Sequence, residues 1–599
     1  MGKLLKRSMI DEKDKWDIAK MFENEEQFNQ CLTEIKQDVN KVLAFKGKIM
    51  LNSDSLYNFY QEYEHFNRKL EKVWVYAKML FDSETNNNEF AVRKMRVEKL
   101  FEQINDKLSF ITPEILSVNK QKVMDFINEN PALEPYRFDL EMLFKYQNHT
   151  LSEAEELIIT KALNAMGTGS QAFNSLNNTD IDLGTITLDD GKTVQLTNSN
   201  YSVYMSSKDR KVRMAAFNNM YHYWKQHINT VASTLKGTIK EHFFISDVHK
   251  FESPLKESLY GDDIDVKVYQ NLIKTVHDNF DKIYDYMAIR KKMLNLDELH
   301  MYDIYVDLVN EKEIKVPFEE GKKIVFEALK PLGEKYLKDL EQAFNNRWID
   351  IYPNIGKRSG AYSWGCYDSY PYLLLNYEND IDSVSTMIHE LGHSMHSYYS
   401  NKTQSYTYHS YPIFLAEIAS TVNEALLNQY LYDHAQTKEE KINYLTQFLD
   451  LFRTTIHRQT MFAEFEMIMY NKEEQGVALT EQEFCDTYYN LNKLYFGDNV
   501  VSDDLIRYEW ARIPHFYTPF YVYKYATGLS AALAIVSEIL NGNTSVRDKY
   551  LEFLASGGSD YPLNILKKVG VDMTTSKPIQ KAFDMFEEKL NLLKKLSEQ

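Results

Sequence analysis

The spacing of apolar residues constrains this chain more than any other feature, because it follows a helical period over most of the length. Only 13 prolines and 21 glycines interrupt the 599 residues, which favours long amphipathic helices rich in Glu, Lys, Leu and Tyr. The chain is also longer than one compact core usually allows. We therefore expect a mainly α fold with at least two lobes.

Two stretches depart from the helical pattern and predict small β elements. Residues 184–196 alternate β-branched residues around an Asp-Asp-Gly turn, which is typical of a β-hairpin. Residues 358–377 alternate Gly, Ser, Tyr and Trp before three leucines, which predicts a small sheet. We place the lobe boundary near the hairpin, with a helical N-terminal lobe at residues 1–190 and a larger second lobe at residues 191–599.

Charge and cysteine usage exclude several classes of partner. The formal net charge of -18 would repel nucleic acids and anionic membranes. No run of about 18 apolar residues is present, so the sequence predicts no membrane-spanning helix. Cys31, Cys366 and Cys485 lie far apart, and the charged start of the chain does not resemble a secretion signal. These features predict a cytoplasmic protein.

The segment His389-Glu390-Leu391-Gly392-His393 carries the clearest chemical signal. Two histidines four positions apart on a helix share one face, so both imidazoles can reach one zinc ion. A carboxylate directly after the first histidine then lies beside the metal and can accept a proton from water. The pattern predicts a catalytic zinc site with His389 and His393 as ligands and Glu390 as general base.

A catalytic zinc site needs a third protein ligand and one open position. The histidine that some related motifs carry ten residues after the first is replaced here by Tyr399. A helix that begins at Pro412 carries Glu417 and Glu424 two turns apart among apolar residues, where an unpaired carboxylate is costly. Spacing leaves both glutamates open as the third ligand.

The chain resembles oligoendopeptidase F, within the wider family of thimet oligopeptidase and neurolysin. The segments that carry the resemblance are residues 184–213, 357–377, 389–396, 416–424, 510–528 and 556–573. The resemblance implies a two-lobed helical zinc metallopeptidase with a deep central channel, a small sheet beside the active-site helix, and the N-terminal lobe as a channel wall or lid. It also implies one zinc ion per chain, Glu417 as its third ligand, and Glu424 as support for a zinc-bound histidine.

The resemblance extends to residues that would hold the substrate. It implies that His515 and a tyrosine stabilise the oxyanion, for which we favour Tyr523, with Tyr517 and Tyr521 as alternatives that also contact substrate. Residues 359–362 resemble the edge strand that holds the substrate backbone, which suggests Gly360 and Ala361 as substrate-binding residues. His396 is interpreted as structural.

The favoured interpretation is a zinc-dependent endopeptidase that cuts internal bonds of short unstructured peptides. A zinc carboxypeptidase or dipeptidase on a related helical scaffold is the first alternative. The second is a peptide-binding protein with a structural zinc, against which Glu390 argues, because a structural site has no use for a base. The sequence does not indicate an oligomeric state.

Overall fold

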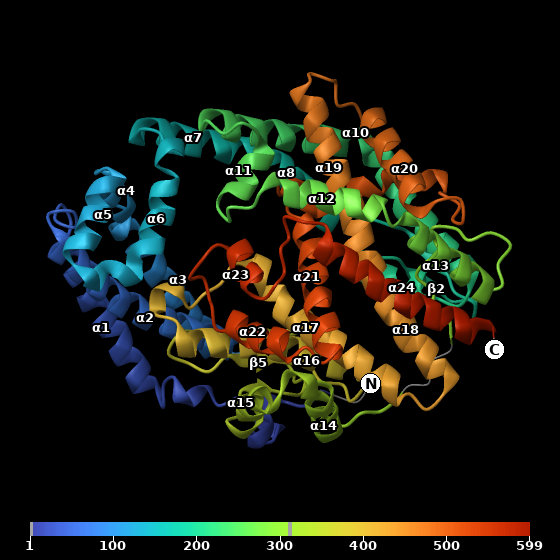
Figure 1. Cartoon of the computed structure of the whole chain (residues 1–599), viewed down its shortest axis with the longest axis horizontal. Helices are drawn as coiled ribbons and strands as arrows, with labels where there is room; N and C mark the ends of the chain where they lie inside the picture. Colours follow the sequence, from blue (N-terminus) through green and yellow to red (C-terminus); the bar gives the residue numbers. More distant parts are fainter. Residues whose placement is uncertain (1–3, 310–313, 599) are drawn as a thin grey trace. The chain divides into compact units, whose positions relative to one another are not determined.

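The computed structural model describes residues 4–309 and 314–598, and most of them lie in helices (Figure 1). Several helices begin where the sequence supplies a polar capping side chain. Asn24, for example, accepts a hydrogen bond from the backbone N–H of Gln27 at the start of α1, and Asn52 caps α2 in the same way. The expected mainly α fold is confirmed.

The chain forms two compact units, and each is assembled from three separate segments. Unit 1 contains Met1–Asn148, Glu313–Tyr430 and Glu538–Gly570, and unit 2 contains His149–Lys312, Leu431–Ser537 and Val571–Gln599. This division differs from the single boundary near residue 190 that we expected, because segments far apart in the sequence pack together within each unit. The implied central channel stays a prediction.

Unit 1 is a helical body with one small sheet. Its helices are α1 (Glu25–Leu43), α2 (Ser53–Ser83), α3 (Asn88–Leu108), α4 (Ile111–Leu116), α5 (Lys120–Glu129), α6 (Arg137–Lys145), α14 (Phe318–Ala328), α15 (Glu334–Asn345), α16 (Ile381–Thr403), the first part of α17 (Ile413–His434), the end of α21 (Tyr523–Leu540), α22 (Thr544–Leu554) and α23 (Pro562–Lys568). Helix α16 packs against α14, α15 and α22, and it therefore lies in the core of the unit.

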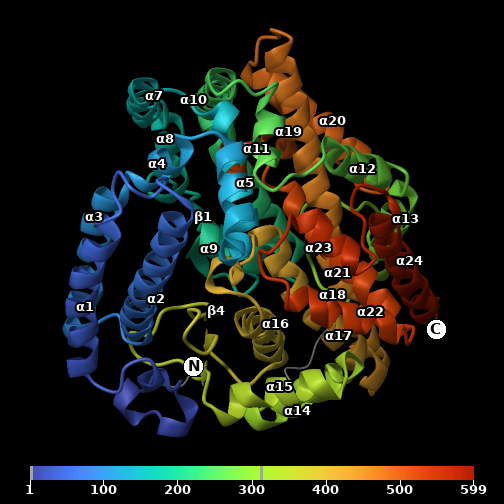
Figure 2. The same ribbon diagram turned by 60° about the vertical axis from the view of Figure 1, so that its left-hand side comes forward.

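The sheet of unit 1 has the strand order β3 (Ile349–Asp350), β5 (Tyr372–Leu374) and β4 (Tyr362–Trp364). Strand β5 is fully buried and pairs with β3 in parallel and with β4 antiparallel. Strand β4 is an edge strand and lies beside α16 (Figure 2). The small sheet expected within residues 358–377 is confirmed and lies beside α16, whereas β3 was not foreseen.

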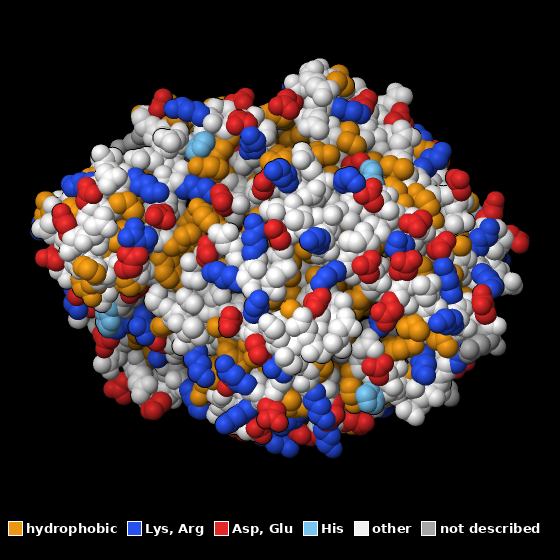
Figure 3. All heavy atoms as spheres, in the orientation of Figure 1, with side chains coloured by type: hydrophobic (Ala, Val, Ile, Leu, Met, Phe, Trp, Pro, Cys, Tyr) orange, Lys and Arg blue, Asp and Glu red, His pale blue; other side chains and the backbone are white. Residues whose placement is uncertain are grey.

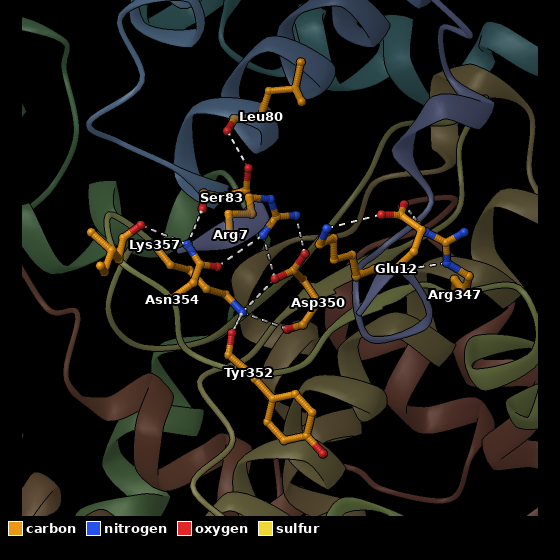
Figure 4. A network of polar contacts seen from close by, with 11 residues as sticks. Arg7, Glu12, Leu80, Ser83, Arg347, Asp350, Tyr352, Asn354 and Lys357 are labelled. Atoms are coloured by element: carbon orange, nitrogen blue, oxygen red, sulfur yellow. Dashed lines mark hydrogen bonds and ion pairs between the residues drawn. The ribbon is translucent and has the colours of Figure 1, made fainter. Parts of the chain in front are cut away.

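A buried ion cluster fixes the start of the described chain to this sheet. Arg7 and Lys357 both point at the carboxylate of Asp350, with Nη2···Oδ2 and Nζ···Oδ1 distances of 2.6 and 2.8 Å (Figure 4). Asn354 accepts a further hydrogen bond from Arg7 and donates one to the carbonyl of Ser83 at the end of α2. The N-terminal segment, α2 and strand β3 are thus joined on one side of the sheet.

Unit 2 is almost entirely helical. Its helices are α7 (Glu153–Met166), α8 (Thr168–Asn178), α9 (Asn198–Met205), α10 (Arg210–Val248), α11 (Pro254–Tyr260), α12 (Val266–His277), α13 (Phe280–Met293), the end of α17, α18 (Lys438–Phe452), α19 (Arg458–Glu474), α20 (Glu481–Phe496), most of α21, and α24 (Lys577–Glu598). The expected hairpin is confirmed, since β1 (Thr185–Thr187) pairs antiparallel with β2 (Thr193–Gln195). Gly191 adopts the positive φ of +80° that its turn requires.

The surface bears both signs of charge. On the face drawn in Figure 3, acidic and basic side chains are interspersed, so the negative excess does not gather into one patch there. Within residues 4–309 and 314–598, every helix falls short of the length or apolar character needed to cross a bilayer.

Candidate metal centre

Helix α16 brings the two histidines of the sequence motif together, as predicted. Asp380 caps the helix by accepting a hydrogen bond from the backbone N–H of Ser383. On the buried side of the helix, Met387, Ile388, Leu391 and Met395 are fully enclosed and fix its rotation. His389 and His393 consequently lie one turn apart on the same face, with their Nε2 atoms 3.2 Å apart.

Helix α17 approaches α16 closely because residue 392 is glycine. A Cβ atom at Gly392 would lie 2.6 Å from the Cα of Ser420 and 2.7 Å from the carbonyl oxygen of Ala419, which no real side chain tolerates. Buried Asn423 adds a hydrogen bond of 3.1 Å from its Nδ2 to the carbonyl of Ile388. The two helices are therefore held at a fixed distance across the site.

Glu417 and Glu424 lie on different sides of the histidine pair. The Oε2 atom of Glu417 is 3.7 Å from Nε2 of His389 and 3.6 Å from Nε2 of His393. The Oε1 atom of Glu424 lies 3.1 Å from Nδ1 of His389, on the opposite edge of that ring. The geometry distinguishes two positions that spacing alone left open.

The three atoms that face one another fit a zinc ion. Ligands at about 2.05 Å from a tetrahedral metal lie about 3.3 Å from each other, and the observed separations of 3.2 to 3.7 Å match that value. Among the described residues, His389, His393 and Glu417 form the group suited to hold a metal ion. A carboxylate on the outer nitrogen of a metal-binding histidine, such as that of Glu424, sets its tautomer and orientation.

The pKa values of the two imidazoles reflect their burial and the charged groups around them. Burial opposes a charge on His389, but the hydrogen bond and charge of Glu424 outweigh it and raise the pKa of His389. Burial and the neighbouring charge of His389 lower the pKa of His393. The pair therefore holds one proton more readily than two.

Glu390 lies between the helix and the edge strand β4. The residue is 8% exposed, and its carboxyl group lies near the backbone of Ser363 on β4. Burial raises the pKa of Glu390 to about 7, although the charge of His389 opposes the shift. The Ser363 hydroxyl also bonds that of Ser394 on α16 at 2.7 Å, so strand and helix are tied beside this carboxyl group.

Two cavities meet at Glu390, and both lie within unit 1. One, of about 470 Å³, is lined by residues 375–378 and by acidic side chains near the start of α16. The other, of about 500 Å³, contains the histidine pair and Glu417. Ala361 and Glu390 line both cavities, so open space continues on either side of the carboxyl group.

The residues expected to form the edge strand lie just before it. Gly360 has a positive φ of +80° and its carbonyl accepts a hydrogen bond from Asn376, and strand β4 starts only at Tyr362. Gly360 lines the first cavity, and Ala361 lines both. His396 is fully buried, and its ring stacks on that of Tyr411 with centroids 3.5 Å apart.

The aromatic segment of residues 515–525 belongs to unit 2 and forms its own hydrogen bonds. The Tyr525 hydroxyl lies 3.2 Å from Nε2 of His515, and the ring of His515 stacks on Tyr521 with centroids 5.9 Å apart. The Tyr517 hydroxyl bonds that of Thr234 at 2.7 Å. Of the four candidate residues in this segment, His515, Tyr517 and Tyr521 are partly exposed within the described chain, and Tyr523 is buried.

Tyr523 differs from its neighbours. Its side chain is fully buried against Tyr269, and its hydroxyl has no hydrogen-bond partner among the described residues. Burial raises its pKa far above the usual value. Just before it, Phe520 adopts a positive φ of 48° and donates its backbone N–H to buried Glu466 at 2.7 Å.

Sequence reasoning missed two residues that shape the metal centre. Asn423 crosslinks the helices, and Glu71 on α2 lines the cavity of the histidine pair. Asn423 is a single amide side chain after the apolar residues at the start of α17. Such a residue gives only a weak indication, in the sequence, of a contact between helices. Glu71 stands next to buried Leu70 and two residues before buried Val73, and this position at the edge of an apolar helix face could have indicated it.

Known proteins resemble this chain over nearly all of its length. The model of peptidase family M3 matches residues 203–585, and that of the oligopeptidase F N-terminal region matches residues 114–182. Oligopeptidase PepF of Bacillus subtilis is 40% identical over 98% of this chain and 88% of its own length. Group B oligopeptidase PepB of Streptococcus agalactiae is 37% identical over 98% of both chains.

Solved structures give the same result. A chain from Chlamydophila abortus that carries a peptidase assignment shares 39% identity, with a TM-score of 0.93 over 99% of this chain and 100% of its own. Oligoendopeptidase F from Enterococcus faecium shares 34% identity, with a TM-score of 0.73 over 95% of this chain and 99% of its own.

Proposed function

The chain belongs to peptidase family M3 and is a metalloendopeptidase, and on this premise we propose that it is a zinc-dependent oligoendopeptidase of short unstructured peptides. The observation that carries the proposal is the convergence of His389, His393 and Glu417 at tetrahedral ligand spacing, beside Glu390 and at the meeting point of two cavities. His389, His393 and Glu417 would hold one zinc ion, and Glu424 would orient His389.

When bound, zinc supplies a Lewis acid that polarises the scissile carbonyl and acidifies water. Glu390 accepts the proton of the attacking water and then delivers it to the leaving amine. This mechanism of hydrolysis therefore requires a base at the position of Glu390.

The space on both sides of Glu390 favours an endopeptidase over the carboxypeptidase alternative. An extended peptide that pairs with edge strand β4 continues in both directions from the bond to be cut. Among the described residues, those that line the smaller cavity include Glu378, Asp380 and Asp382 but no Lys or Arg. A terminal carboxylate would be repelled there, whereas an internal peptide segment is neutral.

The segment of residues 515–525 supplies the remaining catalytic groups in this proposal. A tyrosine hydroxyl, aided by His515, donates a hydrogen bond to the oxyanion that develops on the carbonyl. Support comes from the buried hydroxyl of Tyr523, which has no partner among the described residues, and from the partly exposed side chains of His515, Tyr517 and Tyr521, which can contact substrate. Gly360 and Ala361 contact the substrate backbone before strand β4.

We also infer that the peptidase acts in the cytoplasm on oligopeptides. Cys31, Cys366 and Cys485 are free thiols, which suits a reducing compartment. The net charge of -18 disfavours nucleic acids and anionic membranes as partners.

A single internally quenched peptide, blocked at both ends, tests the function. The protein with zinc should cleave it at an internal bond, a chelator should stop cleavage, and added zinc should restore it. A carboxypeptidase or dipeptidase would leave the blocked peptide intact but release residues from an unblocked one. A protein with structural zinc would leave both intact.

The variant Glu390→Gln sharpens this test, because it keeps the side-chain volume but removes the base. We expect stoichiometric zinc, an unchanged fold and a fall in kcat of about a thousandfold. Metal analysis beside kinetics measures both quantities. Wild-type turnover in this variant would contradict the role of Glu390.

A further inference from the structure

The edge strand β4 is held on each of its two faces by a hydrogen bond between side chains. Because side chains alternate along a strand, Ser363 points to one face and Tyr362 to the other. The Ser363 hydroxyl bonds that of Ser394 on α16 at 2.7 Å. The Tyr362 hydroxyl donates to Oδ2 of Asp82, near the end of α2, at 3.1 Å. Among the hydrogen bonds of the described residues, this one alone joins α2 to β4.

The backbone of β4 leaves one edge open near Glu390. Ser363 is aligned with Leu373 of β5, and the N–H of Leu373 donates to the carbonyl of Trp348, on the side of β3 and away from β4. In an antiparallel pair, two residues that lie opposite each other either bond each other or both point away. The N–H and carbonyl of Ser363 therefore face the open edge, where an added peptide strand would pair with them.

Asp82 is a buried carboxylate that also contacts the chain leading into β4. The residue is 2% exposed. Lys78, one turn earlier on α2, pairs with its Oδ2 atom, and Nη1 of Arg358 lies 3.5 Å from the same atom. The backbone carbonyl of Asp82 accepts the N–H of Arg358 at 2.8 Å. Two cations balance this carboxylate, so it is not left as an uncompensated buried charge.

The segment before β4 follows the end of α2 through further contacts. The N–H and the hydroxyl of Thr85 both donate to the carbonyl of Gly356, at 2.6 and 2.8 Å. Asn354 donates to the carbonyl of Ser83 at 3.1 Å (Figure 4). These bonds fix the approach to the strand, whereas the bond between tyrosine and aspartate fixes the strand itself.

We propose that Asp82 is a positioning residue that, through Tyr362, keeps β4 ordered for pairing with a substrate peptide. The inference rests on the proposed peptidase function. Asp82 lies outside the lining of both cavities, whereas Tyr362 and Ser363 line the cavity of the histidine pair. A strand freed from α2 would have to be ordered by the arriving peptide, and this cost lowers the affinity for substrate. The chemical step is spared, because the proposed metal ligands and base lie on α16 and α17.

The variant Tyr362→Phe tests the inference, because it removes only the hydroxyl and leaves Asp82 with both cations. In the zinc-loaded full chain, KM for the doubly blocked peptide should rise about tenfold, while kcat and zinc affinity change by less than about twofold. Acetohydroxamate binds a metal without a peptide chain, so its inhibition constant should stay the same. A strand that supported only the overall fold would not separate KM from kcat in this way.

Variants of Asp82 test the same bond from its other end. Asp82→Asn keeps an oxygen that accepts the tyrosine O–H, so KM should stay within about threefold of the wild-type value. Asp82→Leu removes the acceptor and should raise KM as much as Tyr362→Phe does. The double variant should show no further rise, because both substitutions remove one shared bond. If Asp82→Leu does not fold, Tyr362→Phe alone decides the inference.

Tyr60→Phe is the matched control. The Tyr60 hydroxyl, also on α2, donates to Asp139 at 3.0 Å, but this bond joins α2 to α6 rather than to β4. Urea denaturation should show similar losses of stability in both tyrosine variants, while KM rises only in Tyr362→Phe. An unchanged KM in Tyr362→Phe, an equal rise in Tyr60→Phe, or weakened inhibition of Tyr362→Phe by acetohydroxamate would each overturn the inference. Failure of the wild type to cut the blocked peptide would instead contradict the proposed peptidase function.

Discussion

The metal cluster of unit 1 and the aromatic segment of unit 2 hold their functional side chains in different ways. In the cluster, each group faces another polar group of the same site, as His389 does between Glu417 and Glu424. In the aromatic segment, the Tyr525 hydroxyl is engaged with His515, while the Tyr523 hydroxyl is enclosed and unpartnered. The polar contacts within the metal cluster fix its geometry. In the aromatic segment, by contrast, the Tyr523 hydroxyl has no hydrogen-bond partner among the described residues.

This difference shows what fixes each arrangement. Two helices with a glycine contact leave the cluster little freedom, because α16 and α17 cannot rotate without exposing buried residues. The aromatic segment begins in one short 3₁₀ turn, Pro514–Tyr517, and contains Phe520 at positive φ, and both conformations depend on the packing around them. Substitutions in the cluster should therefore give the sharper effects.

The largest effect should separate the two glutamates of α17. Glu417→Ala removes a proposed zinc ligand, and two histidines alone hold zinc weakly, so we expect loss of stoichiometric zinc and of activity. Glu424→Ala leaves all three ligand atoms and removes only the partner of His389, so zinc affinity should fall about 10- to 100-fold. Equilibrium dialysis against zinc buffers measures both affinities.

Retention of full zinc by Glu417→Ala, together with its loss in Glu424→Ala, would reverse the two roles. Equal losses would mean that both carboxylates bind the metal. Circular dichroism of the metal-free variants checks that both are folded. We expect them to fold, because neither substitution enlarges a side chain.

The metal cluster could be predicted from the sequence because its spacing is a property of one helix. His389 and His393 meet by helical geometry alone, whereas the choice between Glu417 and Glu424 needed the family resemblance. The hairpin and the helix after Pro412 also followed from local signals. Glu71, in contrast, lies more than three hundred residues before the histidines in the sequence, and only tertiary packing brings it to the cavity that they line.

The division of the chain was less accessible to sequence analysis. A boundary near residue 190 follows from a change of local pattern, but each unit is built from three segments whose contacts are long-range. Strand β3 was also missed, because two buried residues after α15 give no alternating pattern. Such features depend on tertiary packing, which a single sequence expresses only weakly.

A smaller effect is expected in the aromatic segment. Tyr523→Phe removes an unengaged hydroxyl, and if that hydroxyl meets the oxyanion, kcat and kcat/KM should both fall about a hundredfold with little change in KM. Tyr489→Phe, outside the segment, is the matched control, because its hydroxyl is already bonded to the carbonyl of Ser502. Steady-state kinetics on the blocked peptide gives both constants. A loss below about threefold in Tyr523→Phe would transfer the role to another tyrosine of the segment.

The smallest effect compares two helical glycines, one in each region. Gly392 touches the backbone of α17, whereas a Cβ atom at Gly528 of α21 would meet nothing within 4 Å. Gly392→Ala forces the two helices of the metal centre apart, so we expect a loss of about 1 to 3 kcal/mol in the free energy of unfolding. Gly528→Ala only restricts the unfolded chain and should gain about 0.5 to 1 kcal/mol.

The sign of these two changes tests whether close helix contact builds the metal centre. Urea denaturation of the metal-free variants measures stability, and zinc titration measures the effect on the site. Because Glu417 lies on the helix that Gly392→Ala displaces, zinc affinity should fall together with stability, while Gly528→Ala should leave affinity unchanged. A stable Gly392→Ala variant with normal zinc affinity would mean that α17 can move away without carrying its ligand, and the rigid contact would then not be what defines the cluster.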